Sequence, residues 1–225
     1  MKDSMRQRVL IANRGEIAVR AIRACRHLGL DSVAVYSSAD RSAPHAWMAD
    51  QSCCIGPPAS RLSYLNSDAL LHVALSTGCA MVYPGYGFLA ENAAFAEQCG
   101  TAGLIFVGPS PDCIRTMGDK AEARATAEQL GVPVVPGSAQ AYTDAESARQ
   151  ASQDVGYPLL LKASAGGGGR GMRVVTDPAD FTTLFEQASQ EAGEAFGERA
   201  VYLERSFEAG RQHAEQSIAG THGPL

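Results

Sequence analysis

The stretch LLLKASAGGGGRGMRVV, residues Leu159–Val175, decides how the second half of this chain folds and what it can bind. Four consecutive glycines, Gly166–Gly169, are followed by Arg170 and Gly171. Glycines allow positive φ angles and can turn several backbone N–H groups toward one point, which creates a site for anions. Lys162 before the loop and Arg170 inside it add positive charge. Because the flanking residues are apolar or β-branched, the segment predicts two antiparallel strands joined by a phosphate-binding loop.

Several kinds of phosphate loop can be compared with this one. Gly166, Gly168 and Gly171 match G-x-G-x-x-G formally, but the dinucleotide motif needs a following helix and MRVV is strand-like. A Walker A loop ends in GK[ST], whereas here Gly171 is followed by Met172. Strands on both sides of the glycines are typical of kinase flaps, yet no HRD or DFG follows. The pattern therefore favours the flap of another ATP-binding family, with a flexible surface hairpin as the alternative.

Upstream of this loop, short apolar runs alternate with helical stretches, which is typical of βαβ units around a parallel sheet. The expected strands are residues 8–12, 32–36, 52–55, 80–82 and 104–107. The expected helices are residues 16–28, 66–77 and 92–99. GPSPD (108–112) then opens a helical stretch that runs towards Leu130 and that Gly118 interrupts. This part of the chain therefore predicts a Rossmann-like α/β domain.

The character of the sequence changes at GVPVVPGS, residues 131–138, where two prolines and two glycines indicate a hinge or a boundary. The sequence then predicts helices at 144–155 and 180–196 and strands at 159–162, 172–175 and 200–204. Two strands joined by a glycine loop indicate an antiparallel sheet. We therefore predict two domains: residues 1–110, a Rossmann-like α/β domain, and residues 111–225, the first part of an α+β domain.

Composition and charge narrow the class of protein. The chain has 225 residues, enough for one large or two small domains, and 45% of them are apolar, so it can form a buried core. Nineteen basic against 24 acidic side chains give a net charge of −5, which argues against a nucleic-acid surface. Neither a signal-peptide pattern nor a run of about 20 apolar residues is present, so we expect a cytoplasmic protein without a membrane span. The six cysteines lack metal-ligand spacing, and we expect free buried thiols.

Five blocks of the sequence together resemble one family. They are IANRGEIAVR (11–20), YPGYGFLAENAAFA (83–96), FVGPSPDCIRTMGDK (106–120), GVPVVPGS (131–138) and KASAGGGGRGMR (162–173). In this order, and within one register from Val9 to Phe207, they are similar to biotin carboxylase. That enzyme is the ATP-grasp component of acetyl-CoA, propionyl-CoA, methylcrotonyl-CoA and pyruvate carboxylases. The resemblance implies a Rossmann-like pre-ATP-grasp domain, followed by an incomplete α+β ATP-grasp domain that carries the glycine loop as a lid.

The resemblance also implies a reaction and its participants. Biotin carboxylases make carboxyphosphate from ATP and bicarbonate and then carboxylate biotin on a carrier protein. The implied cofactors are ATP, Mg²⁺ and carrier-bound biotin. The implied partners are bicarbonate, the biotin carboxyl carrier protein, a carboxyltransferase and a second copy of the enzyme in a homodimer. Within acetyl-CoA carboxylase, such an enzyme serves fatty acid biosynthesis.

Candidate site residues follow from the motif positions. For ATP, the resemblance implies phosphate contacts from two lysines, a glycine nest, a methionine near adenine, an adenine-binding hinge and one histidine. These are Lys120, Lys162, Gly168, Gly169, Met172, Glu204, Arg205, Ser206, Phe207 and His213. For biotin, the resemblance implies the loop residues Tyr86 and Gly87. Two ammonium groups would clamp a polyphosphate, and a closing glycine lid would keep water away from carboxyphosphate, so the residue types agree with the implied chemistry.

The sequence departs from the family pattern at several positions. Tyr83 stands where His is usual, Ala90 where Ser is usual and Ala165 where Gly is common. After Phe207 the family pattern Arg-His-apolar-Glu is replaced by GRQHAEQS. In strict register Gln212 replaces the family's nucleotide-contacting histidine, whereas with a one-residue insertion His213 takes that position.

The family's metal carboxylates, bicarbonate ligands and biotin-binding arginine are expected beyond Leu225, so we predict no catalytic residue and no metal ligand within these 225 residues. We expect these residues alone to show little or no bicarbonate-dependent ATPase activity, which an assay of biotin-stimulated ADP release would test. Two alternatives stay open. One is another ATP-grasp ligase, such as urea carboxylase or a carbamoyl-phosphate synthetase. The other is a catalytically inactive fragment that binds nucleotide or dimerises.

Overall fold

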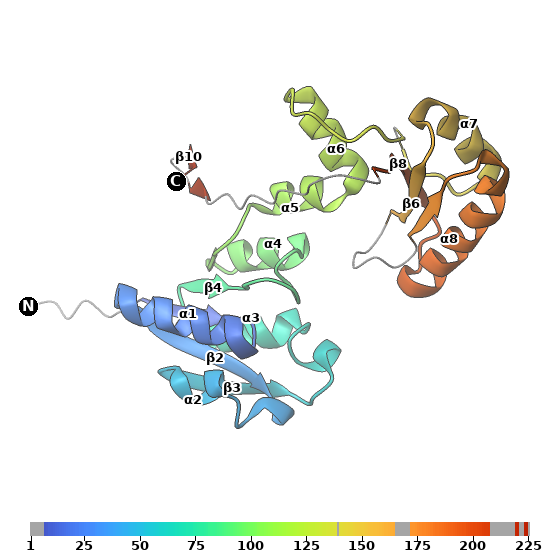
Figure 1. The fold of residues 1–225 in the computed structure, drawn as a ribbon. Coiled ribbons are helices and arrows are strands. Elements are labelled where there is room, and N and C mark those ends of the chain that lie inside the picture. The colour runs from blue at the N-terminus through green and yellow to red at the C-terminus, as the bar shows by residue number, and fades with distance from the viewer. Residues whose placement is uncertain (1–6, 139, 165–171, 208–218, 221–222, 225) are drawn as a thin grey trace, which may run out of the picture. The chain divides into compact units, whose positions relative to one another are not determined.

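The structure, a computed structural model, divides into two compact units, residues 1–118 and 119–225 (Figure 1). It describes residues 7–138, 140–164, 172–207, 219–220 and 223–224. The boundary predicted between residues 110 and 111 precedes a helix, α5 (Pro111–Gly118), which falls in the first unit.

The first unit is built on a five-stranded sheet in which every neighbouring pair of strands is parallel. The strands, in their order across the sheet, are β3 (Gln51–Gly56), β2 (Asp31–Ser37), β1 (Arg8–Ile11), β4 (Met81–Tyr83) and β5 (Ile105–Phe106). β1 lies at the centre, and the chain winds outward from it first through β2 and β3 and then through β4 and β5. This topology confirms the predicted parallel α/β arrangement.

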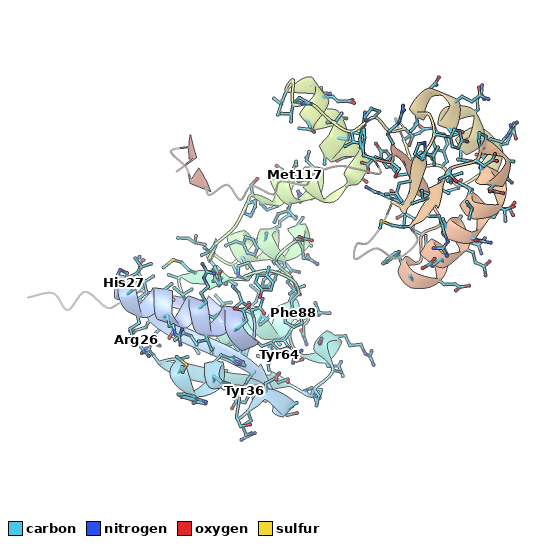
Figure 2. All side chains as sticks on the ribbon, viewed as in Figure 1. Arg26, His27, Tyr36, Tyr64, Phe88 and Met117 are labelled. Carbon is cyan, nitrogen blue, oxygen red and sulfur yellow. The ribbon has the colours of Figure 1, made fainter. Side chains whose placement is uncertain are left out.

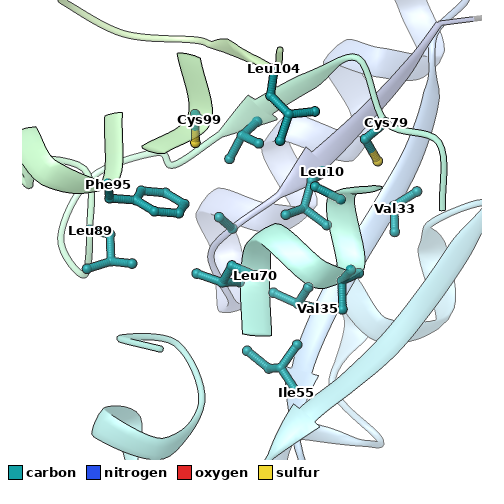
Figure 3. Close-up of a cluster of buried hydrophobic side chains, with 14 of the residues drawn as sticks. Leu10, Val33, Val35, Ile55, Leu70, Cys79, Leu89, Phe95, Cys99 and Leu104 are labelled. Atoms are coloured by element: carbon teal, nitrogen blue, oxygen red, sulfur yellow. The ribbon is translucent and has the colours of Figure 1, made fainter. Parts of the chain in front are cut away.

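Helices pack on both faces of this sheet. They are α1 (Gly15–Leu28), α2 (Pro44–Met48), α3 (Ser67–Ser76) and α4 (Ala93–Thr101). Leu10 of β1 belongs to a core cluster with residues of α3 and α4, part of which Figure 3 shows. The next residue, Ile11, packs with residues of α1 on the opposite face. A strand buried on both faces is apolar at consecutive positions, which is why this strand could be predicted from an uninterrupted apolar run.

Local sequence signals set the helix ends. Asn66 caps α3 and Asn92 caps α4, each by accepting a hydrogen bond from the backbone N–H three residues later. α1 ends at Leu28 and is capped by Gly29, whose φ of +69° suits a residue without a side chain. The sequence prediction contains no helix at α2, because its five residues are too few for a periodic pattern. Pro44, in its first turn, is the local signal that was missed.

The second unit is built on a three-stranded antiparallel sheet with the strand order β7-β6-β8. Its elements are α6 (Lys120–Gln129), α7 (Ala145–Val155), β6 (Leu159–Ala163), β7 (Arg173–Val175), α8 (Phe181–Phe196), β8 (Val201–Arg205), β9 (Ala219–Gly220) and β10 (Gly223–Pro224). Helices α7 and α8 bury one face of the sheet, and Phe181 and Phe185 of α8 stack there with ring centroids 5.9 Å apart. The antiparallel pairing of β6 with β7 confirms the predicted hairpin.

All six cysteines are free thiols. The prediction that they are buried is wrong for two of them, Cys54 and Cys113, which are exposed. Cys54 lies on β3, an edge strand of the sheet, and Cys113 lies on α5, of which only Ile114 is buried. Within the described residues, no helix has the length and apolar character needed to cross a membrane.

Candidate functional site

Side chains of the sheet β7-β6-β8 alternate between its two faces. Leu161 of β6 is fully buried beneath α7 and α8, so its neighbours Leu160 and Lys162 lie on the opposite face. The strand register pairs Lys162 with Tyr202 of β8 and Leu160 with Glu204. We call the face that carries Leu160, Lys162, Tyr202 and Glu204 the second face of the sheet.

Lys162 and Glu204 form an ion pair on the second face. Because Glu204 pairs with the residue two positions before Lys162, the two side chains are diagonal neighbours across β6 and β8. Their side chains are 27% and 24% exposed, respectively. The carboxylate therefore holds the ammonium group at a fixed point that solvent still reaches. Another anion can bind Lys162 there if it displaces the carboxylate.

Exposed apolar side chains lie beside this ion pair. Val174 of β7 pairs with Leu160 and is 52% exposed. Met172 precedes β7, two residues before Val174, and is 41% exposed. A fixed cation next to exposed apolar side chains suits a ligand that has both an anionic and a flat apolar part.

Two residues that the sequence analysis did not name also lie at this face. The hydroxyl of Tyr202 is 3.5 Å from Nη1 of Arg124 on α6, and the same Nη1 donates to the backbone oxygen of Val135 at 2.6 Å. Burial raises the pKa of the Tyr202 phenol, and Arg124 partly offsets this. Strand alternation could have identified Tyr202, because it lies two residues before Glu204 on the same strand. No local pattern connects Arg124 to it.

The predicted hinge, Glu204–Phe207, begins at the end of β8. The backbone N–H of Arg205 donates to the oxygen of Pro136 at 2.7 Å, and that of Ser206 donates to the oxygen of Pro158 at 2.9 Å. These bonds join the hinge to the predicted GVPVVPGS boundary segment and to the residue before β6. They fix the backbone path of the hinge within the second unit.

The side chains of the hinge point to different places. Glu204 contacts Lys162, whereas a guanidinium nitrogen of Arg205 lies 3.4 Å from the backbone oxygen of Val155 at the end of α7. Phe207 is 64% exposed. Among the predicted ATP residues with described side chains, the structure thus joins Lys162 and Glu204 directly and places Met172 immediately before the neighbouring strand β7.

Four of the predicted ATP residues are not described fully. Gly168, Gly169 and His213 lie outside the described residues, as does the side chain of Lys120, whose backbone begins α6. In the described part of the chain, no three His, Cys, Asp or Glu side chains gather in a way that could hold a metal ion. These residues do not fit a magnesium site, and none of them is assigned as a magnesium ligand.

The second predicted site lies in the first unit, at the carboxyl edge of the parallel sheet. Since β1 is flanked by β2 on one side and β4 on the other, the winding of the chain reverses between β1 and β4. Open α/β sheets bind ligands at this kind of position, beyond the carboxyl ends of the strands. Asn13, which follows β1, donates from its amide to the backbone oxygens of Pro84 and Tyr86, at 2.7 and 2.8 Å. Asn13 therefore joins the two loops that meet there.

Tyr86 lies at this position with its phenol donating a hydrogen bond to the carboxylate of Glu16 in the first turn of α1. Tyr86 is 61% exposed, and the hydrogen bond to Glu16 raises the pKa of its phenol. Gly87 has φ +71°, a left-handed conformation that suits glycine. The sequence analysis named Tyr86 and Gly87 but neither Asn13 nor Glu16. Both belong to the quoted block IANRGEIAVR, which could have pointed to them.

Two family models match the chain. Residues 5–114 match the model described as biotin carboxylase, N-terminal domain. Residues 119–223 match the model described as carbamoyl-phosphate synthase L chain, ATP binding domain. The two matches therefore cover almost all of the chain.

Known proteins match in both sequence and structure. A biotin carboxylase from Nostoc sp. is 47% identical over 216 residues, which cover 96% of this chain and 48% of the relative. The biotin carboxylase domain dimer of Hydrogenobacter thermophilus 2-oxoglutarate carboxylase, solved with MgADP, ADP and bicarbonate, matches with a TM-score of 0.85 and 44% identity. That match covers 90% of this chain and 44% of the solved chain. A biotin carboxylase–β-γ-ATP complex from Campylobacter jejuni also gives a TM-score of 0.85 and 44% identity, covering 90% of this chain and 45% of the other.

The chain spans about half the length of the curated relatives it matches. Its parallel sheet, its antiparallel sheet with Lys162 on one face, and these matches define an ATP-grasp protein. More particularly, the chain belongs to the biotin carboxylase family, whose members are ATP-dependent ligases.

Proposed function

We propose that this chain forms the ATP-binding part of a biotin carboxylase, which makes carboxyphosphate from ATP and bicarbonate and then carboxylates biotin on a carrier protein. The observation that carries this proposal is the second face, where the ammonium group of Lys162 is fixed beside the exposed side chains of Met172 and Val174. The relatives solved with MgADP and bicarbonate and as a β-γ-ATP complex support it.

Phosphate binding requires Lys162 to change partners. In the proposed complex, Lys162 leaves Glu204 and contacts a phosphate oxygen, while Lys120 at the start of α6 supplies a second ammonium group. Charge-assisted hydrogen bonds of this kind are stronger than neutral ones. They neutralise the phosphate charge as bicarbonate attacks the terminal phosphorus and ADP leaves. Gly168 and Gly169 would cover the phosphates with backbone N–H groups.

Adenine would bind along the hinge and against Met172. Because the N–H groups of Arg205 and Ser206 already donate within the second unit, the hinge would offer the base its carbonyl oxygens and the N–H of Phe207. An adenine edge carries an amino donor next to a ring-nitrogen acceptor, which matches a carbonyl oxygen followed by an N–H. The exposed Met172 side chain would cover the ring. His213 would complete the nucleotide contacts, as the family resemblance implies.

The remaining participants are proposed from the family. Biotin would bind at the loop of Tyr86 and Gly87, presented by the carrier protein, and a carboxyltransferase would use the product. Mg²⁺, when bound, would neutralise phosphate charge, with ligands that lie outside the described residues. A homodimer is supported by the relative from Hydrogenobacter thermophilus, which was solved as a dimer. A cytoplasmic location stays a prediction from the sequence.

The lysines offer a direct test of ATP binding. The chain contains three, Lys2, Lys120 and Lys162, so a chain labelled with ¹³C at the lysine ε position gives a small set of NMR signals. We expect MgATP to shift the signals of Lys120 and Lys162 and to leave that of Lys2 in place. Lys120→Met and Lys162→Met assign the signals.

A matched control separates binding from a general charge effect. Arg149 lies on α7 and pairs with Glu146 at the surface, so Arg149→Met removes a cation away from the proposed site. We expect calorimetry to show weaker ATP binding for Lys162→Met and unchanged binding for Arg149→Met. Equal binding by wild type and Lys162→Met, with no shift of the lysine signals, would reject the proposed site.

A further inference from the structure

The loop that follows β4 holds one residue in a conformation that its side chain disfavours. Phe88 has φ +41°, and among the described residues no other non-glycine residue has a positive φ. Gly85 and Gly87 before it are also left-handed, with φ +66° and +71°. A residue with a side chain keeps this conformation only where its surroundings hold it, and such residues cluster at functional sites.

Two side chains hold the ring of Phe88. It stacks on Tyr64 with ring centroids 5.0 Å apart and planes 20° from parallel, and Figure 2 labels both residues. The guanidinium carbon of Arg14 lies 5.6 Å from the Tyr64 centroid and 5.9 Å from that of Phe88. Stacking and cation–π attraction both favour this arrangement.

Tyr64 is fixed in turn by hydrogen bonds. It is 1% exposed, and its hydroxyl accepts from the backbone N–H of Ser37 at 2.9 Å and donates to Asp40 at 2.7 Å. Asp40 also lies 3.4 Å from Nη1 of Arg14. The stack is therefore anchored at the end of β2 through Tyr64 and after β1 through Arg14.

Tyr86 lies two residues before Phe88, between two points of the loop that are held by other residues. Asn13 holds the backbone oxygen of Tyr86 on one side of the loop, and the stacked ring of Phe88 holds the other side. Between these two points, the Tyr86 phenol reaches Glu16. A loop with glycines on both sides of Tyr86 would otherwise sample many conformations.

We propose that Phe88, stacked on Tyr64 and next to Arg14, is a positioning residue that holds Tyr86 in contact with Glu16. It acts through the loop and touches no reacting atom. The statement that this loop binds biotin rests on the proposed function, whereas the position of Tyr86 can be measured without a ligand.

The ionisation of Tyr86 reports its position. NMR of the 225-residue chain with ¹³C-labelled tyrosine rings follows each phenol, and Tyr86→Phe assigns the signal of interest. The hydrogen bond to Glu16 raises the pKa of Tyr86 in the wild type. In Phe88→Leu, which stays apolar but cannot stack, we expect this pKa to fall back toward the ordinary value of about 10. In the conservative variant Phe88→Tyr, we expect the raised pKa to be kept.

An unchanged Tyr86 pKa in folded Phe88→Leu would overturn the positioning role. If circular dichroism shows that Phe88→Leu is unfolded, Arg14→Met provides the test, because the Arg14 side chain is 50% exposed and its loss removes the cation beside the two stacked rings. The Tyr86 pKa is then expected to fall in Arg14→Met, and an unchanged value overturns the proposal in the same way.

Free biotin separates the positioning role from the proposed function. We expect biotin to shift the Tyr86 signal of the wild type and to bind Phe88→Leu about tenfold more weakly, since misplaced contacts weaken binding steeply. Phe88→Tyr should bind like the wild type. If the Tyr86 pKa responds to Phe88→Leu but no chain binds biotin, the positioning role stands and the biotin assignment fails. If the Tyr86 pKa is unchanged in Phe88→Leu and this variant binds biotin as the wild type does, the positioning role fails and the biotin assignment stands.

Discussion

His45 shows how a single residue can make the first unit sensitive to pH. It lies on α2, is 0% exposed, and belongs to a helix that packs against α1, β2 and β3. Burial lowers the pKa of its imidazole, because a charged ring would lose its hydration. The carboxylate of Asp40 attracts the charged form and partly offsets this, whereas Arg14 disfavours it.

We therefore expect the first unit to lose stability as the pH falls from about 7 to about 5. The unfolded chain protonates His45 near pH 6.5 and the folded chain only at lower pH, so the unfolded state binds more protons in this window. Asp40 and Asp50 act at lower pH, because hydrogen bonds to their carboxylates lower the pKa of both groups from the ordinary aspartate value. Urea unfolding of wild type and His45→Gln across this range is the measurement. The free energy of unfolding should change much less with pH in His45→Gln than in the wild type. An equal pH dependence in both would show that His45 does not cause the loss of stability.

We expect substitution of Glu204 to change the affinity for ATP in the opposite direction from substitution of Lys162. Its carboxylate competes with phosphate for the ammonium group and repels a triphosphate, so Glu204→Gln should bind ATP about threefold more tightly, as expected for a partly exposed ion pair. Lys162→Met should bind at least about tenfold more weakly, since a charge-assisted bond is lost. Isothermal titration of both variants measures this. Weaker binding by Glu204→Gln would show that its carboxylate helps to hold the nucleotide.

At the scale of elements, β6 has one face buried in the core and one face that carries the proposed ATP-binding residues. Leu161 is fully buried under α7 and α8, whereas its neighbour Leu160 lies on the second face. The same substitution at these adjacent positions should therefore have different effects.

We expect Leu161→Ala to lower the free energy of unfolding of the second unit by about 3 kcal/mol, because it leaves a cavity in a closed core. Leu160→Ala should cost less than about 1 kcal/mol. Chemical denaturation followed by circular dichroism compares the two variants. Similar losses of stability in both variants would mean that the second face is packed as tightly as the face buried under α7 and α8.

The elements that could be predicted from the sequence are those with a strong local pattern. β1 is an apolar run, α1 is capped by Gly29, and the hairpin of β6 and β7 follows from strand-like residues around glycines. The contacts that build the sites depend on pairing across the chain. The sequence identified Lys162 and Glu204 separately as candidates. Their ion pair depends on the register of β6 and β8, because the two residues are 42 positions apart in the chain.

No local sequence pattern predicts the stacking of Tyr64 and Phe88 in the first unit, because this contact also depends on pairing across the chain. Tyr64 follows β3 and Phe88 follows β4, and the fold brings their rings together. Residue preferences also do not predict the positive φ of Phe88, because aromatic residues avoid this conformation. The sequence motifs therefore point to these loops as candidates but do not predict how their side chains meet.

At the scale of the whole molecule, each unit has a hydrophobic core of its own. Leu10 and Phe95 belong to a cluster formed entirely by the first unit, and Leu161 and Phe185 to one formed entirely by the second. Units with separate cores can unfold as separate cooperative transitions.

We expect calorimetry of the whole chain to resolve two unfolding transitions. Leu161→Ala should lower the midpoint of one transition, and Phe95→Leu, which loses volume in the other core, should lower the midpoint of the other. A single transition that both substitutions lower equally would contradict independent unfolding.

If ATP binds at the second face as proposed, the ion pair between Lys162 and Glu204 would make that face selective among anions. Inorganic phosphate or chloride would replace a carboxylate that already neutralises the ammonium group, and the exchange of one partner for another gains little. In the proposed complex, a nucleotide would also bring a base that covers the exposed Met172 and Val174, so burial of apolar surface would add to its affinity. The salts that are abundant in a cell would therefore compete only weakly with ATP for this lysine.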